Sequence, residues 1–210
     1  NHFNKTLLWV DENFDKYRIS DALMTIYKLI WDDFCSWLLE LVKPEYGKPI
    51  DAATHARIIV LFENNLRLLH PFMPFLTEEL WHFISARATK EALTVSSWPT
   101  SEPYDSELIT NFEITKEVIA GIRKFRKDKN ISFKEKVTVY VTNSSAPLPY
   151  ESCIIKLGML DEIIYSEAPE DLSGGSFRVS KLEFFIPTLA PEDTEAEKEK
   201  LHAELKYTKG

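Results

Sequence analysis

The chain has 210 residues, a formal net charge of -8, and a hydrophobic content of 44% that includes thirteen Phe and five Trp. This composition supports a packed core in one or two domains and excludes a disordered chain. No apolar run approaches the roughly 20 residues of a membrane span, and two cysteines without disulfide or metal-site spacing agree with a reducing cytoplasm.

The first seventy or so residues have the apolar periodicity of helices. We expect a short helix at 4–14, a long helix of about six turns from Ser20 towards Pro44, and a third helix capped by Asp51. The long helix should bury the apolar residues that recur every three or four positions, which are Leu23, Ile26, Ile30, Phe34, Trp37, Leu38 and Leu41.

A proline-rich elbow follows the third helix. Pro71 and Pro74 lack backbone donors and disfavour helix before them, so the chain must turn there. Thr77, followed by two glutamates, then predicts the N-cap of a fourth helix that continues to about Ala86. We expect His70, just before the turn, to satisfy carbonyls at the helix end.

A fifth helix is predicted at about 106–129, after an extended segment at 89–104 that Trp98 should anchor across a bundle of five helices. The net charge of the chain argues against nucleic acid. Residues 116–136, however, hold eight Lys or Arg against three acids, a local charge of +5. An acidic chain can still bind RNA through one basic face.

After Phe133 the pattern becomes that of a small β-α-β-β unit. Alternating residues and turn signals predict the following elements: a strand at 136–142, a helix at 150–160, strands at 162–165, 178–179 and 182–186, and a turn at Gly174-Gly175. From Glu192 the chain is charged and helical in pattern.

Two stretches are specific enough to indicate a family. Residues 68–81 read Leu-Leu-His-Pro-Phe-Met-Pro-Phe-Leu-Thr-Glu-Glu-Leu-Trp, and a Trp-x-x-Phe-Cys-x-Trp core starts at Trp31. Both resemble the anticodon-binding helical domain of class I aminoacyl-tRNA synthetases of the valine, isoleucine and leucine group. The second is most similar to the valyl enzymes. A less specific basic helix at 122–126 also resembles this family.

The resemblance implies a mainly α fold in three parts. Residues 1–133 would form a helical bundle of the anticodon-binding type that lacks the family's first helix. Residues 134–190 would form the small α/β unit, and residues 191–210 the start of a C-terminal coiled-coil helix. Asn1 stands where an initiator Met would be, so we expect a part of a longer protein.

The resemblance also implies a function. The catalytic signatures of class I synthetases and metal-site spacings are missing from the sequence, so we expect this region to be non-catalytic and to hold no cofactor. The parent enzyme would use ATP with Mg to attach valine to tRNA(Val) and would hydrolyse mischarged threonine. Expected partners are the tRNA(Val) anticodon stem-loop and the catalytic and editing domains of the same chain, in a monomeric cytoplasmic enzyme without membrane contact.

The candidate RNA-binding residues are basic side chains expected at the surface, together with one leucine. The basic residues are Lys43, Arg57, Arg67, Arg123, Lys124, Arg126 and Lys127. The resemblance adds Leu39, which corresponds to a leucine that holds an anticodon base. The aromatic residues and one cysteine at stripe positions are expected in the core rather than on bases, and these are Trp31, Phe34, Cys35, Phe62 and Trp81.

Two alternatives remain open. A helical protein-interaction module without an RNA role predicts scattered basic charge and an apolar surface patch instead. The equivalent region of an isoleucyl or leucyl enzyme would keep the class of function and change the amino acid.

Overall fold

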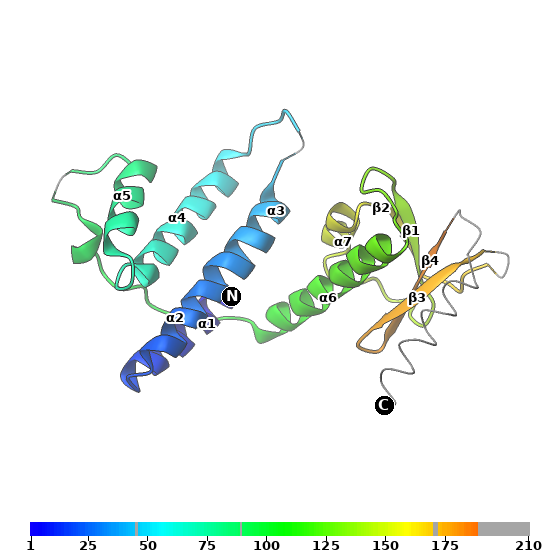
Figure 1. The fold of residues 1–210 in the computed structure, drawn as a ribbon, viewed down its shortest axis with the longest axis horizontal. Coiled ribbons are helices and arrows are strands. Elements are labelled where there is room, and N and C mark those ends of the chain that lie inside the picture. The colour runs from blue at the N-terminus through cyan, green and yellow to red at the C-terminus, as the bar shows by residue number, and fades with distance from the viewer. Residues whose placement is uncertain (45, 89, 170–171, 189–210) are drawn as a thin grey trace. The chain divides into compact units, whose positions relative to one another are not determined.

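The structure, a computed structural model, describes residues 1–44, 46–88, 90–169 and 172–188. They form two compact units that divide between Thr110 and Asn111. The first unit is helical and the second combines helices with a sheet (Figure 1), which confirms the predicted fold class. The predicted start of a coiled-coil helix lies outside the described residues.

The helical unit contains most of the helices. In chain order they are α1 (His2–Asp15), α2 (Ile19–Lys28), the π-helical η1 (Leu29–Leu38), α3 (Leu39–Val42), α4 (Ala52–Leu69), α5 (Pro74–Ile84) and the short 3-10 helix η2 (Leu93–Val95). The long helix α6 (Ser106–Asp128) begins in this unit and ends in the second. Among the described residues, no helix combines the length and apolar content needed to cross a membrane.

The predicted long helix is continuous through α2, η1 and α3, but its middle is not α-helical. In η1 the backbone is wound as a π-helix, whose hydrogen bonds span five residues rather than four. The hydroxyl of Ser36 follows the same spacing and donates to the carbonyl of Trp31 at 2.8 Å. A period above 3.6 residues rotates the buried face of the helix from one turn to the next.

This rotation overturns part of the predicted core. Ile26 and Phe34 are buried as expected, whereas Trp31 is 59% exposed and Cys35 is also exposed. The prediction that Trp31 and Cys35 are buried is therefore wrong, because it assumed one uniform period. Leu23, also predicted in the buried stripe, is exposed as well, although it lies in α2 before the π-helical segment.

Two apolar clusters form the core of the helical unit. The larger one joins α1, α2, η1 and α4 through Leu7, Val10, Ile26, Leu29 and Leu68. The smaller one joins α4, α5 and η2 through Leu66, Trp81 and Leu93. The segment after η2 is anchored as predicted, because the Trp98 ring packs edge-on against Phe14 and its Nε1 donates to Asp11 at 2.9 Å.

The helix ends around the elbow are only partly as predicted. Asp51 caps α4 by accepting from the backbone N–H of Thr54 at 2.8 Å, and the chain turns between Leu69 and Pro74. Thr77 is not the N-cap of α5, since the helix begins three residues earlier with Pro74 in its first turn. Thr77 instead lies buried, and its hydroxyl donates to the Met73 carbonyl at 2.8 Å.

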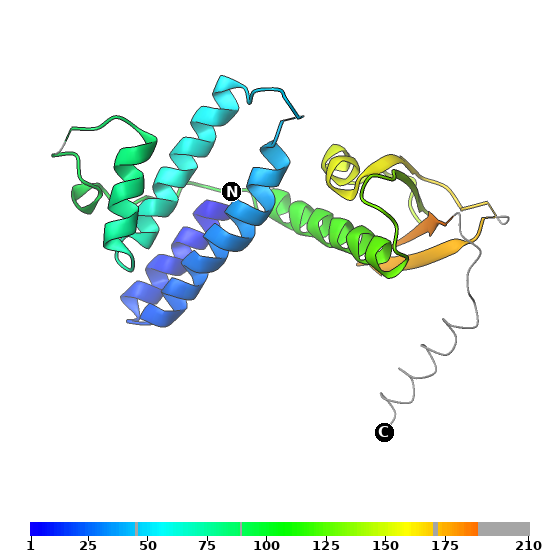
Figure 2. The same cartoon turned by 45° about the horizontal axis from the view of Figure 1, so that its top comes forward.

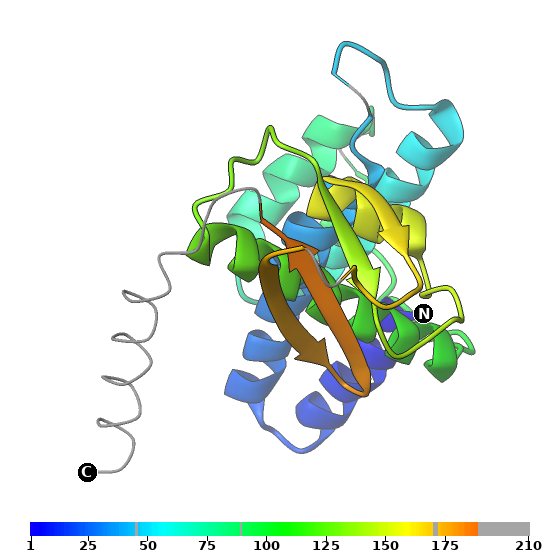
Figure 3. The same ribbon diagram turned by 90° about the vertical axis from the view of Figure 1, so that its right-hand side faces the viewer.

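The second unit contains a four-stranded mixed sheet in the order β2-β1-β4-β3 (Figure 3). Its elements are β1 (Val137–Val141), α7 (Glu151–Gly158), β2 (Leu160–Ile164), β3 (Gly174–Val179) and β4 (Leu182–Pro187). Strands β1 and β2 are parallel, which requires the α7 crossover, and β4 pairs antiparallel with both β1 and β3. This order of strands and helix confirms the predicted β-α-β-β unit.

The glycine pair of the second unit is not a turn. Gly174 and Gly175 lie inside β3, paired with β4. A Cβ at Gly175 would lie 2.6 Å from the Phe125 ring, and one at Gly121 would lie 2.4 Å from the Phe177 ring. Both glycines therefore allow α6 and β3 to pack closely, which places the C-terminal part of α6 with the sheet.

Candidate RNA-binding surface

Three of the predicted RNA-binding residues lie at one end of the helical unit. The Phe34 and Phe62 rings stack at 5.6 Å between centroids, so η1 and α4 lie side by side. The two segments run in opposite directions because a short connection joins α3 to α4 (Figure 2). Leu39 is five residues after Phe34, and Arg57 is five residues before Phe62. The antiparallel arrangement therefore brings Leu39 and Arg57 to roughly the same level, next to Lys43 at the start of the connection.

The side chains at this end are accessible to a ligand. Leu39 is 38% exposed, and Lys43 and Arg57 are both exposed. The Lys43 Nζ lies 3.6 Å from a carboxylate oxygen of Glu40, and both side chains are at least half exposed. An exposed pair of this kind contributes little in water. An incoming phosphate can therefore compete with Glu40 for the lysine.

The connection between α3 and α4 adds two residues that sequence reasoning missed. The Tyr46 side chain is fully exposed, and Lys48 follows in the same connection. Gly47 has φ +79°, a conformation that glycine adopts without steric cost, and it turns the backbone directly after the tyrosine. An aromatic ring between two lysines was the available signal, because exposed aromatic rings can stack on unpaired bases.

Arg67 lies elsewhere on α4 and has structural contacts. It is ten residues, or about 15 Å along the helix, from Arg57. Its guanidinium lies 4.7 Å from the centre of the Trp81 ring and donates to Asn64 at 2.8 Å. Burial holds the pKa of Arg67 below its usual range, although the guanidinium stays charged at neutral pH. These contacts support the fold around Trp81 and give no geometric support for RNA binding.

The basic residues of α6 belong to the second unit and divide into two kinds. Lys124 and Lys127 are exposed and three positions apart, which puts them on one helix face. Arg123 is half-buried, and its Nε donates to the Leu157 carbonyl at 3.3 Å. Only the two lysines have the exposure expected of phosphate-binding groups.

Arg126 is a correction to the predicted site. It is fully buried, so the prediction that it lies at the surface is wrong. Its guanidinium nitrogens donate to the backbone carbonyls of Ser132, Glu135 and Met159. Burial lowers the pKa of Arg126, and a nearby carboxylate acts in the opposite direction. The side chain therefore fixes the loops around α6 and is not available to RNA.

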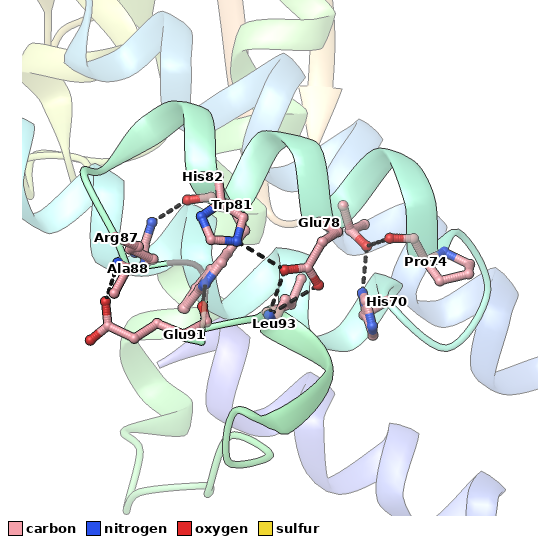
Figure 4. Close-up of polar contacts among 10 residues, drawn as sticks. His70, Pro74, Glu78, Trp81, His82, Arg87, Ala88, Glu91 and Leu93 are labelled. Carbon is pink, nitrogen blue, oxygen red and sulfur yellow. Dashed lines mark hydrogen bonds and ion pairs between the residues drawn. The ribbon is translucent and has the colours of Figure 1, made fainter.

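The first polar residues of the elbow motif serve the turn itself (Figure 4). His70 Nδ1 lies 2.7 Å from the Thr77 hydroxyl oxygen, whose proton already goes to the Met73 carbonyl at 2.8 Å. Figure 4 draws the longer contact of the same hydroxyl with the Pro74 carbonyl, at 3.2 Å. A hydroxyl has one proton, so His70 must donate through Nδ1. The expectation that the His70 ring satisfies helix-end carbonyls is wrong, since it binds the next helix.

The later residues of the motif hold the segment that follows α5 (Figure 4). The Glu78 carboxylate accepts from the backbone N–H of Leu93 at 2.9 Å, and Trp81 Nε1 donates to the Glu91 carbonyl at 2.9 Å. The Arg87 guanidinium lies 3.7 Å from the centre of the Trp81 ring and pairs with Glu63. His70, Thr77, Glu78 and Trp81 are therefore occupied by structural contacts, whereas Glu79 is exposed.

The described residues offer no cluster of three or more His, Cys, Asp or Glu side chains that could hold a metal ion. The candidate surface of the helical unit, formed by Leu39, Lys43, Tyr46, Lys48 and Arg57, is exposed, basic and partly apolar. Such a surface suits the contact of side chains with phosphates and unpaired bases.

The fold agrees with comparison to known families. The family described as the anticodon-binding domain of tRNA ligase matches residues 1–141, and the chain belongs to this family. The chain is 49% identical to the valine–tRNA ligase of Christiangramia forsetii over 209 residues, which are 99% of this chain and 24% of that protein.

More distant relatives carry the same name. The valine–tRNA ligase of Porphyromonas gingivalis is 45% identical over 199 residues, 94% of this chain and 22% of that protein. That of Thermotoga maritima is 30% identical over 200 residues, 94% of this chain and 23% of that protein. The chain thus spans about a quarter of the length of the curated relatives it matches.

Proposed function

We propose that this chain is the anticodon-binding part of a valine–tRNA ligase and that it binds the anticodon stem-loop of tRNA(Val). The observation that carries the proposal is the grouping of Leu39, Lys43 and Arg57 at one end of the helical unit, in a chain of the anticodon-binding family. We call this grouping, with Tyr46 and Lys48, the α3–α4 surface.

Each group on the α3–α4 surface has a distinct role in the proposal. Lys43, Lys48 and Arg57 contact phosphates, which positions the RNA without reading its sequence. Leu39 presents an apolar side chain to one anticodon base, and the Tyr46 ring stacks on another unpaired base. Lys124 and Lys127 on α6 add phosphate contacts at a second place on the tRNA.

The chemistry of the whole enzyme belongs to other parts of the chain. In the proposed parent, a catalytic domain activates valine with ATP and Mg and transfers it to tRNA(Val), and an editing domain hydrolyses mischarged threonine. The region described here holds the tRNA so that its acceptor end reaches those domains. The proposed enzyme is monomeric and works in the cytoplasm.

The alternatives differ in their support. The relatives above are valine–tRNA ligases, which favours the valyl group over an isoleucyl or leucyl enzyme. The protein-interaction module predicts an apolar surface patch, and the helical unit does expose large apolar side chains. Such a patch and an RNA surface can exist on one unit, so binding has to be measured directly.

Fluorescence anisotropy tests the proposal with labelled stem-loops that carry a valine anticodon or an unrelated anticodon. We expect tighter binding of the valine stem-loop, and steep weakening with salt because Lys and Arg contacts release counterions. Arg57→Glu should weaken binding of both RNAs, whereas Lys28→Glu, an exposed lysine on α2, serves as the matched control. Equal binding of both stem-loops, unchanged by Arg57→Glu, would refute the proposed surface.

A further inference from the structure

Helix α5 is apolar on two sides, and only one of them is covered by the described chain. Its inner side carries Thr77, Leu80, Trp81 and Ile84. Trp81 belongs to the cluster with Leu66 and Leu93, and the side chains of Leu80 and Ile84 pack against that cluster. This side accounts for the attachment of α5 to α4 and η2.

The outer side of α5 exposes large apolar side chains. Phe75 is 90% exposed, Phe83 is 86% exposed and Leu76 is 47% exposed, and Met73 at the N-cap is 45% exposed. With 3.6 residues per turn, Phe75, Leu76 and Phe83 fall within an arc of roughly 100° that lies away from Trp81. We call Met73, Phe75, Leu76 and Phe83 the outer face of α5.

This pattern is that of a helix between two layers. A surface helix normally has one apolar stripe opposite a polar face, and a helix that is apolar around most of its circumference is buried. Two nearly fully exposed phenylalanines in the same arc form an apolar patch rather than scattered exposure. The polar groups of α5 do not explain the patch, because Glu78 is bonded to Leu93 on another side of the helix.

The charge around the outer face favours a protein as its occupant. Helix α5 contains no Lys or Arg, and Glu79, which is exposed, lies between Phe75 and Phe83 in the arc. An RNA backbone or an anionic lipid surface would be repelled by this carboxylate. An apolar protein surface with a Lys or Arg opposite Glu79 would complement both the rings and the charge.

We propose that the outer face of α5 docks against another segment of the same ligase chain, outside the 210 residues. This inference rests on the proposed function, namely that the chain is part of a longer valine–tRNA ligase. The relatives indicate where the docking segment comes from, because this chain covers only about a quarter of their length. The outer face is then an interdomain contact that orients the anticodon-binding unit.

Photo-crosslinking in the whole ligase tests the docking directly. A benzophenone amino acid replaces Phe83 in the full-length enzyme, and the same amino acid at Tyr46, exposed in the α3–α4 connection, is the control. We expect Phe83 to yield an intramolecular crosslink to a peptide outside these 210 residues, with or without tRNA. A crosslink to a second copy, a crosslink to added tRNA, or no protein crosslink would each overturn the proposal.

A stability comparison gives a second readout. Phe83→Gln keeps a good helix former at an exposed position, so the 210-residue chain should keep its Tm. The same substitution should lower the Tm of the full-length ligase by several degrees, whereas Leu80→Gln should destabilise both proteins. An equal Tm of the wild-type and Phe83→Gln full-length enzymes would overturn the proposal.

Anticodon preference separates this inference from the proposed function. If the outer face serves interdomain docking, the Phe83→Gln chain discriminates stem-loops as well as wild type does. If the variant loses RNA binding, the outer face belongs to the RNA surface and the docking proposal fails. If wild type itself shows no anticodon preference, the proposed function fails, whatever the crosslinks show.

Discussion

Arg126 shows how one side chain can define the geometry of the second unit. Its guanidinium is buried, and its two terminal nitrogens donate to carbonyls of the connection after α6 and of Met159, just before β2. Its Nε has no hydrogen-bond partner among the described residues. A buried cation is tolerated only when its donors are paired, because desolvation of the charge is expensive. The loop after α6 itself pairs the Ser132 carbonyl with the Glu135 N–H, and the arginine adds the donors for the Glu135 and Met159 carbonyls.

Replacement of this arginine should be strongly destabilising. Arg126→Met keeps the length of the side chain but removes the guanidinium donor of the Glu135 carbonyl, at a cost of about 1–3 kcal/mol for an unsatisfied group. The Ser132 carbonyl keeps the backbone N–H of Glu135 as a donor at 3.1 Å. The neighbouring Lys127→Met changes the same charge at an exposed position and should stay within about 0.5 kcal/mol of wild type. Urea denaturation of both variants measures the difference. Equal urea midpoints for the two variants would mean that the hydrogen bonds of Arg126 do not stabilise the fold.

The π-helical segment predicts opposite outcomes for two aromatic residues three positions apart. Phe34 is 6% exposed and stacks on Phe62, so Phe34→Ala should cost about 3–5 kcal/mol or make the protein insoluble. Trp31 is exposed, so Trp31→Ala should cost no more than about 0.5 kcal/mol. Chemical denaturation followed by circular dichroism checks both variants. A large loss for Trp31→Ala would place this residue in the core, as a uniform α-helix predicts.

At the scale of elements, the sequence predicted features that depend on local chemistry. The Asp51 cap and the turn at the two prolines follow from backbone donors and acceptors within a few residues, and both are present. Features that depend on distant neighbours were not predictable in this way. Gly175 lies in a strand, where the absence of a side chain leaves room for the Phe125 ring. Thr77 is not a helix cap, because its buried hydroxyl binds His70.

The candidate site follows the same rule. The end of the long helix and the start of the third helix could be predicted, and these two elements carry Leu39, Lys43 and Arg57. Arg126 could not be recognised as buried, because the carbonyls that bind it come from loops whose course the apolar pattern does not reveal. Tyr46 was not predicted, because a single exposed aromatic residue in a connection leaves no periodic pattern in the sequence.

The contact between α7 and the end of β2 gives a pH-dependent prediction. The Tyr165 hydroxyl donates to Glu151 at 2.6 Å and accepts from the Leu148 N–H at 2.8 Å. Burial, followed by the hydrogen bond to Glu151, raises the pKa of Tyr165 from 10.0 to about 12. The neutral phenol is thus favoured in the folded state. Its stabilising effect is complete below pH 10 and is lost as the pH rises towards 12.

Tyr165→Phe tests this contribution. The variant should be less stable than wild type at pH 8, because the Leu148 N–H loses its acceptor. The difference in free energy of unfolding should shrink between pH 10 and pH 12, as the wild-type phenol ionises on unfolding. Lysine titration affects both proteins equally and cancels in the difference. A difference that stays constant over this range would contradict the assignment.

The chain has a negative net charge but carries local groups of basic residues. A net charge of -8 repels RNA at long range, so binding depends on short-range contacts and is sensitive to salt. The exposed lysines of α6 and the α3–α4 surface belong to different compact units. The proposed function assigns phosphate contacts to both units, so a stem-loop tests the helical unit and a full-length tRNA tests both. With full-length tRNA, the effect of losing phosphate contacts should therefore be distinguishable from the effect of losing a base contact.

The final prediction compares a phosphate-binding pair with the proposed base-binding leucine. Lys124→Glu combined with Lys127→Glu should weaken binding of tRNA(Val) and of a tRNA with a replaced anticodon by the same factor, because phosphate contacts carry no sequence information. The slope of log K against log salt should become shallower by about two, one unit for each lost contact. Leu39→Ala should instead reduce the ratio between the two affinities and leave the salt slope unchanged. Filter binding at several salt concentrations measures both quantities. If the lysine pair alters the ratio, the role of these lysines as phosphate contacts is wrong. If Leu39→Ala leaves the ratio unchanged, Leu39 does not read the anticodon.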